Sequence, residues 1–170
     1  MTTRTITPAE QGRLRTLNLA AAALHLAQAV AVVVLATDFA LPITASYIAG
    51  PTGLAVAGFL FLSFLAHLIV ATVWFRNYIG DLSRQINRAR WVEYSFSSTL
   101  MLVVIAQLVG ITDVSALIGI SGANISMILF GWLQEKYEVA GGGGWLPFIF
   151  GCIAGIVPWL AVIFYTIAPG

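Results

Sequence analysis

Five long apolar stretches divide this chain, and shorter segments rich in polar, glycine or proline residues separate them. Each stretch is roughly 19 to 23 residues long, which is the length of helix that crosses a hydrocarbon core of about 30 Å. The predicted transmembrane helices cover about residues 17–36, 53–74, 91–109, 114–134 and 146–168. The pattern therefore predicts an all-α fold, a polytopic transmembrane helix bundle that forms a single membrane domain over residues 1–170.

Composition supports a membrane protein and argues against several other classes. Hydrophobic residues make up 59% of the chain and charged residues 9%, whereas a soluble domain carries about 25% charged residues. The net charge of +1 gives no indication of nucleic-acid binding, and the single Cys152 cannot form a disulfide within the chain. The sequence contains no HExxH motif, cysteine cluster or phosphate-binding loop. We therefore expect neither an enzyme nor a metal site.

Local signals in the sequence mark where the helices should begin. Thr7-Pro8-Ala9-Glu10 has the form of a capping box with proline in the first helical turn, so the first helix should start there. Asp81 is expected to cap a third helix that runs from about Leu82 to Val109. Thr112 or Asp113 should cap the fourth helix after a very short turn, which makes the third and fourth helices antiparallel neighbours.

The basic residues predict the orientation of the bundle. They all fall before the first span, between the second and third spans, or between the fourth and fifth; they are Arg4, Arg13, Arg15, Arg76, Arg84, Arg88, Arg90 and Lys136. The other connections, one of them a loop expected over residues 37–52, carry only Asp38 and Asp113. Because cytoplasmic connections are enriched in lysine and arginine, we expect a multi-pass protein of the cell membrane with a cytoplasmic N-terminus.

Three ionisable side chains lie inside the predicted spans at similar depths. His25 is about 12 Å and His67 about 10 Å from the inner ends of their spans, and Glu93 enters from the same side. Such groups are costly inside a membrane and indicate a functional site by default. We expect the three to share a polar pocket with water, with Ser63 one helical turn from His67 and Ser97 one turn from Glu93.

Less specific explanations compete with each of these interpretations. Either histidine, taken alone, is more often a satisfied buried side chain, and Glu93 could be an interfacial carboxylate paired with Arg90 or Arg88. Met127 and Gly131 lie one turn apart, and such a pair is more often ordinary helix packing than a slot for a ligand.

Several longer motifs carry a family resemblance. They are Arg90-Trp91-Val92-Glu93-Tyr94-Ser95, the run GANISMILFGWLQEKY over residues 122–137, Leu146-Pro147-Phe148, and the run FGCIAGIVPW over residues 150–159. Through these motifs the chain resembles a heliorhodopsin from its first span onward. The resemblance implies the first five helices of a seven-helix rhodopsin-like fold, with a topology inverted relative to other microbial rhodopsins.

The resemblance also implies a cofactor and roles for individual residues. Heliorhodopsins hold retinal as a protonated Schiff base on a lysine of the seventh helix, and they are regarded as light sensors rather than efficient ion pumps. Glu93 matches the Schiff-base counterion, and His25 and His67 match histidines of the Schiff-base cavity, where Ser63 and Ser97 join the expected proton relay. The matches to positions around the chromophore are Tyr94, Ser98, Met101, Asn124, Met127 and Gly131.

One departure from the family concerns its lysine. Lys136 is the single lysine of the sequence, and it is expected in a cytoplasmic loop over residues 135–144, where it cannot replace the retinal lysine. We therefore expect that lysine outside this chain segment, and we favour the interpretation that these residues are a fragment. A homodimer and an unidentified signalling partner are left open. Two other functions remain: a small-solute or proton transporter component that uses Glu93, His25 and His67 as a relay, and a structural membrane scaffold.

Overall fold

The computed structural model describes residues 4–36, 52–139 and 141–168, and all regular secondary structure within them is helical. The helices are α1 (Pro8–Leu35), α2 (Thr52–Ala71), α3 (Phe75–Ser83), α4 (Arg88–Leu108), α5 (Val114–Tyr137) and α6 (Leu146–Ile167). All of them except α3 are long and apolar enough to cross a membrane. The predicted all-α transmembrane bundle is therefore confirmed. The loop expected after the first span falls almost wholly on residues 37–51, outside the described part of the chain.

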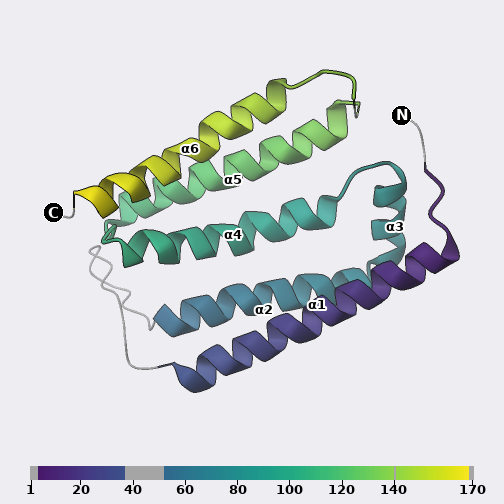
Figure 1. Cartoon of the computed structure of the whole chain (residues 1–170), viewed down its shortest axis with the longest axis horizontal. Coiled ribbons are helices and arrows are strands. Elements are labelled where there is room, and N and C mark those ends of the chain that lie inside the picture. The colour runs from purple at the N-terminus through teal and green to yellow at the C-terminus, as the bar shows by residue number, and fades with distance from the viewer. Residues whose placement is uncertain (1–3, 37–51, 140, 169–170) are drawn as a thin grey trace.

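The five long helices lie side by side, and each runs antiparallel to the next one along the chain (Figure 1). The main contacts are between α1 and α2, α2 and α4, α4 and α5, and α5 and α6. The short α3 lies across one end of the row, and the start of α1 and the end of α6 lie at opposite ends of the molecule. The order of packing thus follows the order of the sequence.

Two of the predicted helix starts are confirmed. The Thr7 side chain accepts a hydrogen bond from the Glu10 backbone N–H at 3.3 Å, and the Glu10 carboxylate accepts one from the Thr7 backbone N–H at 2.8 Å. This is the reciprocal capping box, which satisfies two backbone donors that the helix itself leaves free. At α5, the Asp113 carboxylate accepts from the Ala116 backbone N–H at 2.9 Å.

The prediction for the third helix is wrong in its first part. A single helix from Leu82 does not form, because a separate short helix, α3, lies between the second and third spans and ends at Ser83. Gln85 then adopts a left-handed backbone with φ of 61°, which interrupts the helical path. A new helix begins at Arg88, where the Asn87 side chain accepts from the Arg90 backbone N–H at 3.1 Å.

Asp81 is not a helix cap, contrary to the sequence prediction. Its side chain is only 2% exposed, and it accepts hydrogen bonds from Arg84 at 3.0 Å and from Arg88 at 2.7 Å. A buried carboxylate needs such charged partners because burial without them is strongly unfavourable. Asp81 therefore joins the end of α3 to the start of α4, and this requirement competes with its use as a cap.

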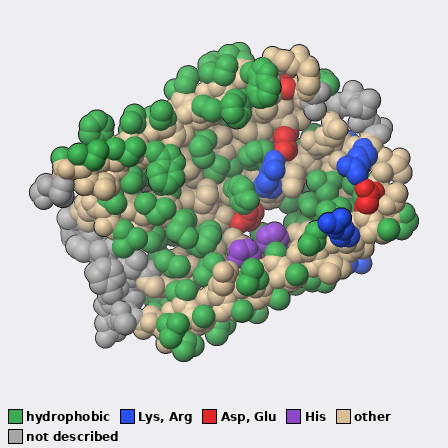
Figure 2. Space-filling view, viewed as in Figure 1, with side chains coloured by type: hydrophobic (Ala, Val, Ile, Leu, Met, Phe, Trp, Pro, Cys, Tyr) green, Lys and Arg blue, Asp and Glu red, His purple; other side chains and the backbone are tan. Residues whose placement is uncertain are grey.

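The surface of the bundle is that of a protein surrounded by lipid. Hydrophobic side chains cover most of the face seen in Figure 2, whereas charged side chains gather toward one end. A small buried cluster of Leu102, Ala106, Ile111, Leu117 and Ile120 secures the tight turn between α4 and α5. Since large apolar residues stay exposed on every long helix, the bilayer rather than a protein core covers them.

Candidate functional site

Glu93 lies in the second turn of α4, half-buried against α2. Its Oε1 accepts hydrogen bonds from Ser63 Oγ of α2 at 2.7 Å and from Ser97 Oγ of α4 at 2.7 Å. Both serines are almost fully buried, with 4% and 2% of their surface exposed. Two hydroxyl donors on one oxygen stabilise a carboxylate where water is scarce. Ser97 lies one turn from Glu93 as expected, and Ser63, which the sequence related to His67 by spacing alone, also donates to Glu93.

His67 is held by a residue that the sequence reasoning missed. Its Nδ1 lies 2.9 Å from Oδ1 of the buried Asn18 on α1. The Asn18 amide donates its Nδ2 hydrogen to the Leu14 carbonyl at 2.9 Å, which orients Oδ1 toward His67. An amide oxygen only accepts, so His67 carries its hydrogen on Nδ1, and Nε2 of the neutral ring remains an acceptor. Asn18 lies two helical turns before His25, and that spacing was the signal available in the sequence.

The structure brings the two histidines together. The rings of His25 and His67 stack with their centroids 5.5 Å apart and their planes 14° apart. His25 Nδ1 is buried, and no side chain or backbone group of the described residues hydrogen-bonds to it. Two parallel rings at this distance disfavour a positive charge on both at once.

A polar pocket of about 150 Å³ links His67 to Glu93. Its polar lining comes from Asn18, His67, Tyr78, Asn87, Arg90, Glu93 and Tyr94. A second, apolar groove of about 290 Å³ between α2 and α4 shares Ala66, Val70, Ala89 and Glu93 with it. Figure 2 shows an opening beside the purple histidines. Glu93 thus stands at the boundary between a pocket that can hold water and a surface suited to hydrocarbon.

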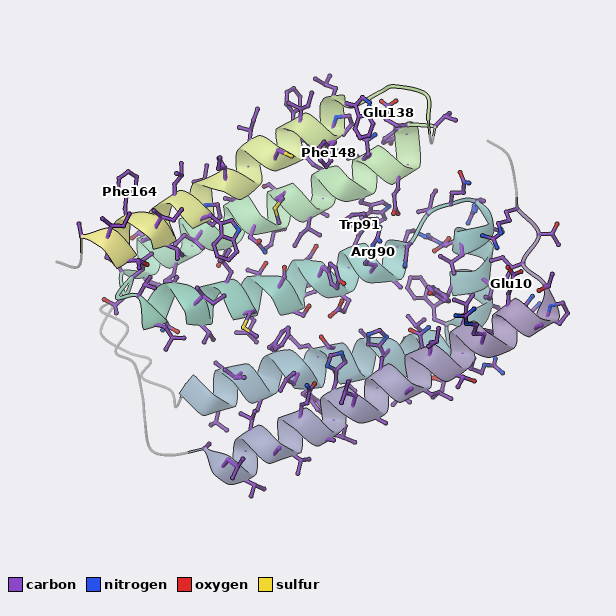
Figure 3. The ribbon with its side chains drawn as sticks, viewed as in Figure 1. Glu10, Arg90, Trp91, Glu138, Phe148 and Phe164 are labelled. Atoms are coloured by element: carbon purple, nitrogen blue, oxygen red, sulfur yellow. The ribbon has the colours of Figure 1, made fainter. Side chains whose placement is uncertain are left out.

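Glu135, near the end of α5, fastens the start of α4. Its carboxylate forms an ion pair with Arg90 and accepts from Trp91 Nε1 at 2.7 Å and from the Asn87 backbone N–H at 2.8 Å. Figure 3 shows Arg90 and Trp91 between the two helices. The alternative in which Glu93 pairs with Arg90 or Arg88 is therefore wrong, because these arginines pair with Glu135 and Asp81 instead.

Among the residues expected around a chromophore, three lie along one face of α4. Tyr94 lines the polar pocket and is 47% exposed, while Ser98 and Met101 are partly buried. The Ser98 hydroxyl donates to the Tyr94 carbonyl at 2.7 Å and accepts from Asn124 Nδ2 of α5 at 3.0 Å. Asn124 also donates to Thr99 at 2.9 Å. Asn124 therefore joins α5 to the face of α4 that carries these residues.

The other two expected residues contact neighbouring helices. A Cβ added at Gly131 would overlap the ring of Trp91, so the space beside this glycine is already filled by α4. The Met127 thioether packs closely over Gly155 of α6. Met127 and Gly131 therefore pack against different neighbours and do not line one slot within the described residues.

The family model for heliorhodopsins matches residues 14–170, a range that contains every site residue named above and nearly the whole of the five spans. The chain belongs to the heliorhodopsin family. It is accordingly a rhodopsin-like, multi-pass membrane protein. No curated protein matches the sequence.

The heliorhodopsin fold implies retinal, and the described residues fit the charged end of that chromophore. Glu93 supplies a carboxylate stabilised by two serines, and the adjoining pocket has room for a few water molecules. The single lysine of the sequence does not lie at this site. Lys136 was expected in a loop, but it lies in the last turn of α5, exposed, with Nζ 4.8 Å from the centroid of the Tyr137 ring. It does not line the polar pocket.

Proposed function

We propose that this chain is the counterion-bearing part of a retinal-binding, light-sensing membrane protein. The observation that carries the proposal is the setting of Glu93. Its Oε1 is satisfied by Ser63 and Ser97, whereas its Oε2 has no hydrogen-bond partner among the described residues. One oxygen is thus held in place, and the other remains available to a positively charged ligand group. A carboxylate so prepared suits a counterion.

Bound retinal would supply light absorption and, through its linkage to a lysine, a positive charge within the membrane. The chain's own residues would stabilise that charge and hold its proton. Ser63 and Ser97 fix the Glu93 carboxylate, and Asn18 fixes the His67 ring so that Nε2 can accept a proton. The ring of His25 stacks against that of His67. Tyr94, Ser98, Met101, Asn124, Met127 and Gly131 remain the positions proposed around the chromophore.

The retinal lysine must then come from helices outside these 170 residues, since Lys136 is exposed at the end of α5. The grouping of arginines at one end of the molecule supports an N-terminus in the cytoplasm. We further propose a sensory rather than a pumping or enzymatic role, as in the family. Its signalling partner and any homodimer belong to the same proposal.

The test replaces Glu93→Gln in the complete light-absorbing protein. The glutamine keeps the shape of the side chain but removes the opposing charge, so the chromophore should lose its proton at a lower pH and its absorption maximum should shift. Visible spectra recorded across a pH titration measure both effects. Glu138→Gln is the matched control, because Glu138 lies at the same end of the molecule but outside the polar pocket. An unchanged spectrum and titration in Glu93→Gln would remove Glu93 from the counterion role.

A proton or small-solute transporter component is the second candidate, and the stacked histidines beside the polar pocket favour it. Against it, no hydrogen bond joins His67 to Glu93 in the part of the chain that the structure describes. This candidate predicts pH-dependent flux into liposomes without retinal. A scaffold, by contrast, predicts that simultaneous neutral replacement of His25, His67 and Glu93 changes stability alone.

A further inference from the structure

We propose that a pocket between the N-terminal segment, α1 and α3 binds an anionic glycerophospholipid, with Arg13 on its phosphate. The pocket has a volume of about 330 Å³. Its lining residues are Arg4, Ile6, Glu10, Arg13, Leu14, Leu17 and Leu82. This site is separate from the polar pocket at Glu93, and the proposal does not rest on the proposed light-sensing function.

Three parts of the chain build this lipid pocket. The Arg4 backbone N–H donates to the Ser83 carbonyl at the end of α3 at 2.9 Å, which ties the N-terminal segment beside Leu82. The Arg4 side chain reaches back to the Glu10 carboxylate at 2.5 Å. The same carboxylate takes part in the capping box that starts α1. The rim of the lipid pocket is therefore held in place by hydrogen bonds to both helices.

The lipid pocket combines a polar and an apolar part, as a phospholipid does. Arg13 lies one helical turn before Leu17, the first residue of the apolar part of α1. One turn of helix spans about 5.4 Å along its axis. The apolar lining, Ile6, Leu14, Leu17 and Leu82, lies next to the arginines. A ligand with a phosphate followed by acyl chains would satisfy both parts, whereas a free anion would leave the apolar part uncovered.

Charge favours an anionic headgroup over a zwitterionic one. Arg4 is paired with Glu10, but Arg13 forms no ion pair with any carboxylate in the described residues. The lining of the lipid pocket thus has one positive charge in excess, which a single phosphodiester neutralises. Arginine suits that partner because its guanidinium can donate two parallel hydrogen bonds to phosphate oxygens. Anionic lipids are attracted to clusters of arginine beside a membrane span.

Arg76 provides a matched control for Arg13. It lies on α3 at the same end of the molecule, is exposed, and forms no ion pair with a described carboxylate. It does not line the lipid pocket. Replacement of either arginine with glutamine removes one positive charge from the same surface. If lipid binding were a general electrostatic attraction, both substitutions would weaken it equally. If the lipid occupies a defined site, only Arg13→Gln weakens its binding.

The experiment measures how many phosphatidylglycerol molecules stay bound to the purified full chain, by native mass spectrometry in mixed micelles that also contain phosphatidylcholine. We expect the wild-type chain to retain one phosphatidylglycerol in preference to phosphatidylcholine. Arg13→Gln should weaken that retention about tenfold, the size expected for one charge-assisted phosphate contact. Arg76→Gln should change it by less than about twofold. Equal losses in the two variants, or no loss in Arg13→Gln, would overturn the proposal.

A competition experiment separates a lipid from a free anion. Inorganic phosphate and soluble glycerophosphoglycerol are added to the wild-type complex at concentrations well above that of the lipid. Neither should displace phosphatidylglycerol, because neither covers the apolar lining of the lipid pocket. Displacement by inorganic phosphate as effective as that by the lipid would show a simple anion site and contradict the proposal. Since Arg13 and Arg76 are both exposed, far-ultraviolet circular dichroism should show the same fold in both variants.

Discussion

At the scale of single residues, the solvation of Glu93 is the feature on which the site depends. A charged carboxylate within a membrane span needs donors, and Ser63 and Ser97 provide them to one oxygen from two different helices. Water has little access to the two serine hydroxyls, because both side chains are buried. The serines therefore substitute for water at that oxygen.

This arrangement predicts a measurable cost for Ser97→Ala. Loss of one donor to a carboxylate should lower the free energy of unfolding by about 1 to 2 kcal/mol. Unfolding in mixed detergent micelles, followed by circular dichroism, measures the change. Ser95→Ala is the control, because Ser95 is also buried on α4 but donates to the Trp91 carbonyl of its own helix at 2.8 Å. An equal cost in both variants would mean that the hydrogen bond to Glu93 stabilises the fold no more than a hydrogen bond within α4.

Gly131 gives a second prediction at this scale. An alanine there would collide with the ring of Trp91, which cannot swing away freely because Glu135 holds its Nε1. Gly131→Ala should therefore lower the free energy of unfolding by about 1 to 3 kcal/mol. Gly122 lies in the same helix with no atom within 4 Å of an added Cβ, so Gly122→Ala should be neutral or slightly stabilising. The same unfolding assay compares the two, and a harmless Gly131→Ala would contradict the observed packing.

Part of the site could be read from the sequence and part could not. Depth along the spans was enough to place His67 and Glu93 around one pocket and His25 against His67, because helical rise is nearly constant, although His25 does not itself line that pocket. Partners across helices were harder to predict, since they depend on how each helix is rotated about its axis. The hydrogen bond from Ser63 to Glu93 was not predicted for that reason, and Asn18 was missed altogether.

At the scale of the helices, the contact between α5 and the start of α4 positions the region of Glu93. The Glu135 carboxylate pairs with the guanidinium of Arg90 and accepts from the indole N–H of Trp91, both in the first turn of α4. It also accepts from the backbone N–H of Asn87, just before that turn. The first backbone N–H groups of a helix have no partner within it, so an acceptor from another helix is favourable there. Glu135 thus adds a contact between helices to the local cap that the Asn87 side chain provides.

Glu135→Ala should loosen that turn more than it destabilises the whole chain. The free energy of unfolding should fall by about 2 kcal/mol, because three hydrogen bonds to a partly exposed carboxylate are lost. Hydrogen exchange of the amides of residues 87–91, measured by mass spectrometry, should become faster. Glu138→Ala serves as the control, since Glu138 forms no ion pair with a described residue. Unchanged exchange at residues 87–91 in Glu135→Ala would show that this contact does not hold the helix start.

The helices themselves were largely predictable, and the exception has a physical cause. Long apolar runs and two capping residues located the spans and the starts of α1 and α5. The segment before α4 was misread because Asp81 resembles a cap in the sequence. In the structure it is buried between Arg84 and Arg88, an arrangement that depends on the chain folding back over α3.

At the scale of the whole molecule, the single row of helices leaves Glu93, the proposed counterion, without a lysine beside it. The mass of the protein in its native membranes, after borohydride reduction to trap any retinal, tests the proposed assembly. We expect a retinyl adduct on a lysine outside these residues, in a chain larger than 18.2 kDa or in a partner chain. A bare chain of 18.2 kDa without an adduct in any partner would favour the transporter or scaffold functions instead.

The packing of each helix against its neighbours in sequence also has a consequence for biosynthesis. At synthesis rates of about 5 to 20 residues per second, several seconds separate the emergence of α2 from that of α6. Glu93 draws its two hydroxyl donors from α2 and from its own helix. These two hydrogen bonds can therefore form once α2 and α4 are side by side, before α5 and α6 pack against them. The hydrogen bonds that stabilise the Glu93 carboxylate in its membrane span therefore do not depend on α5 or α6.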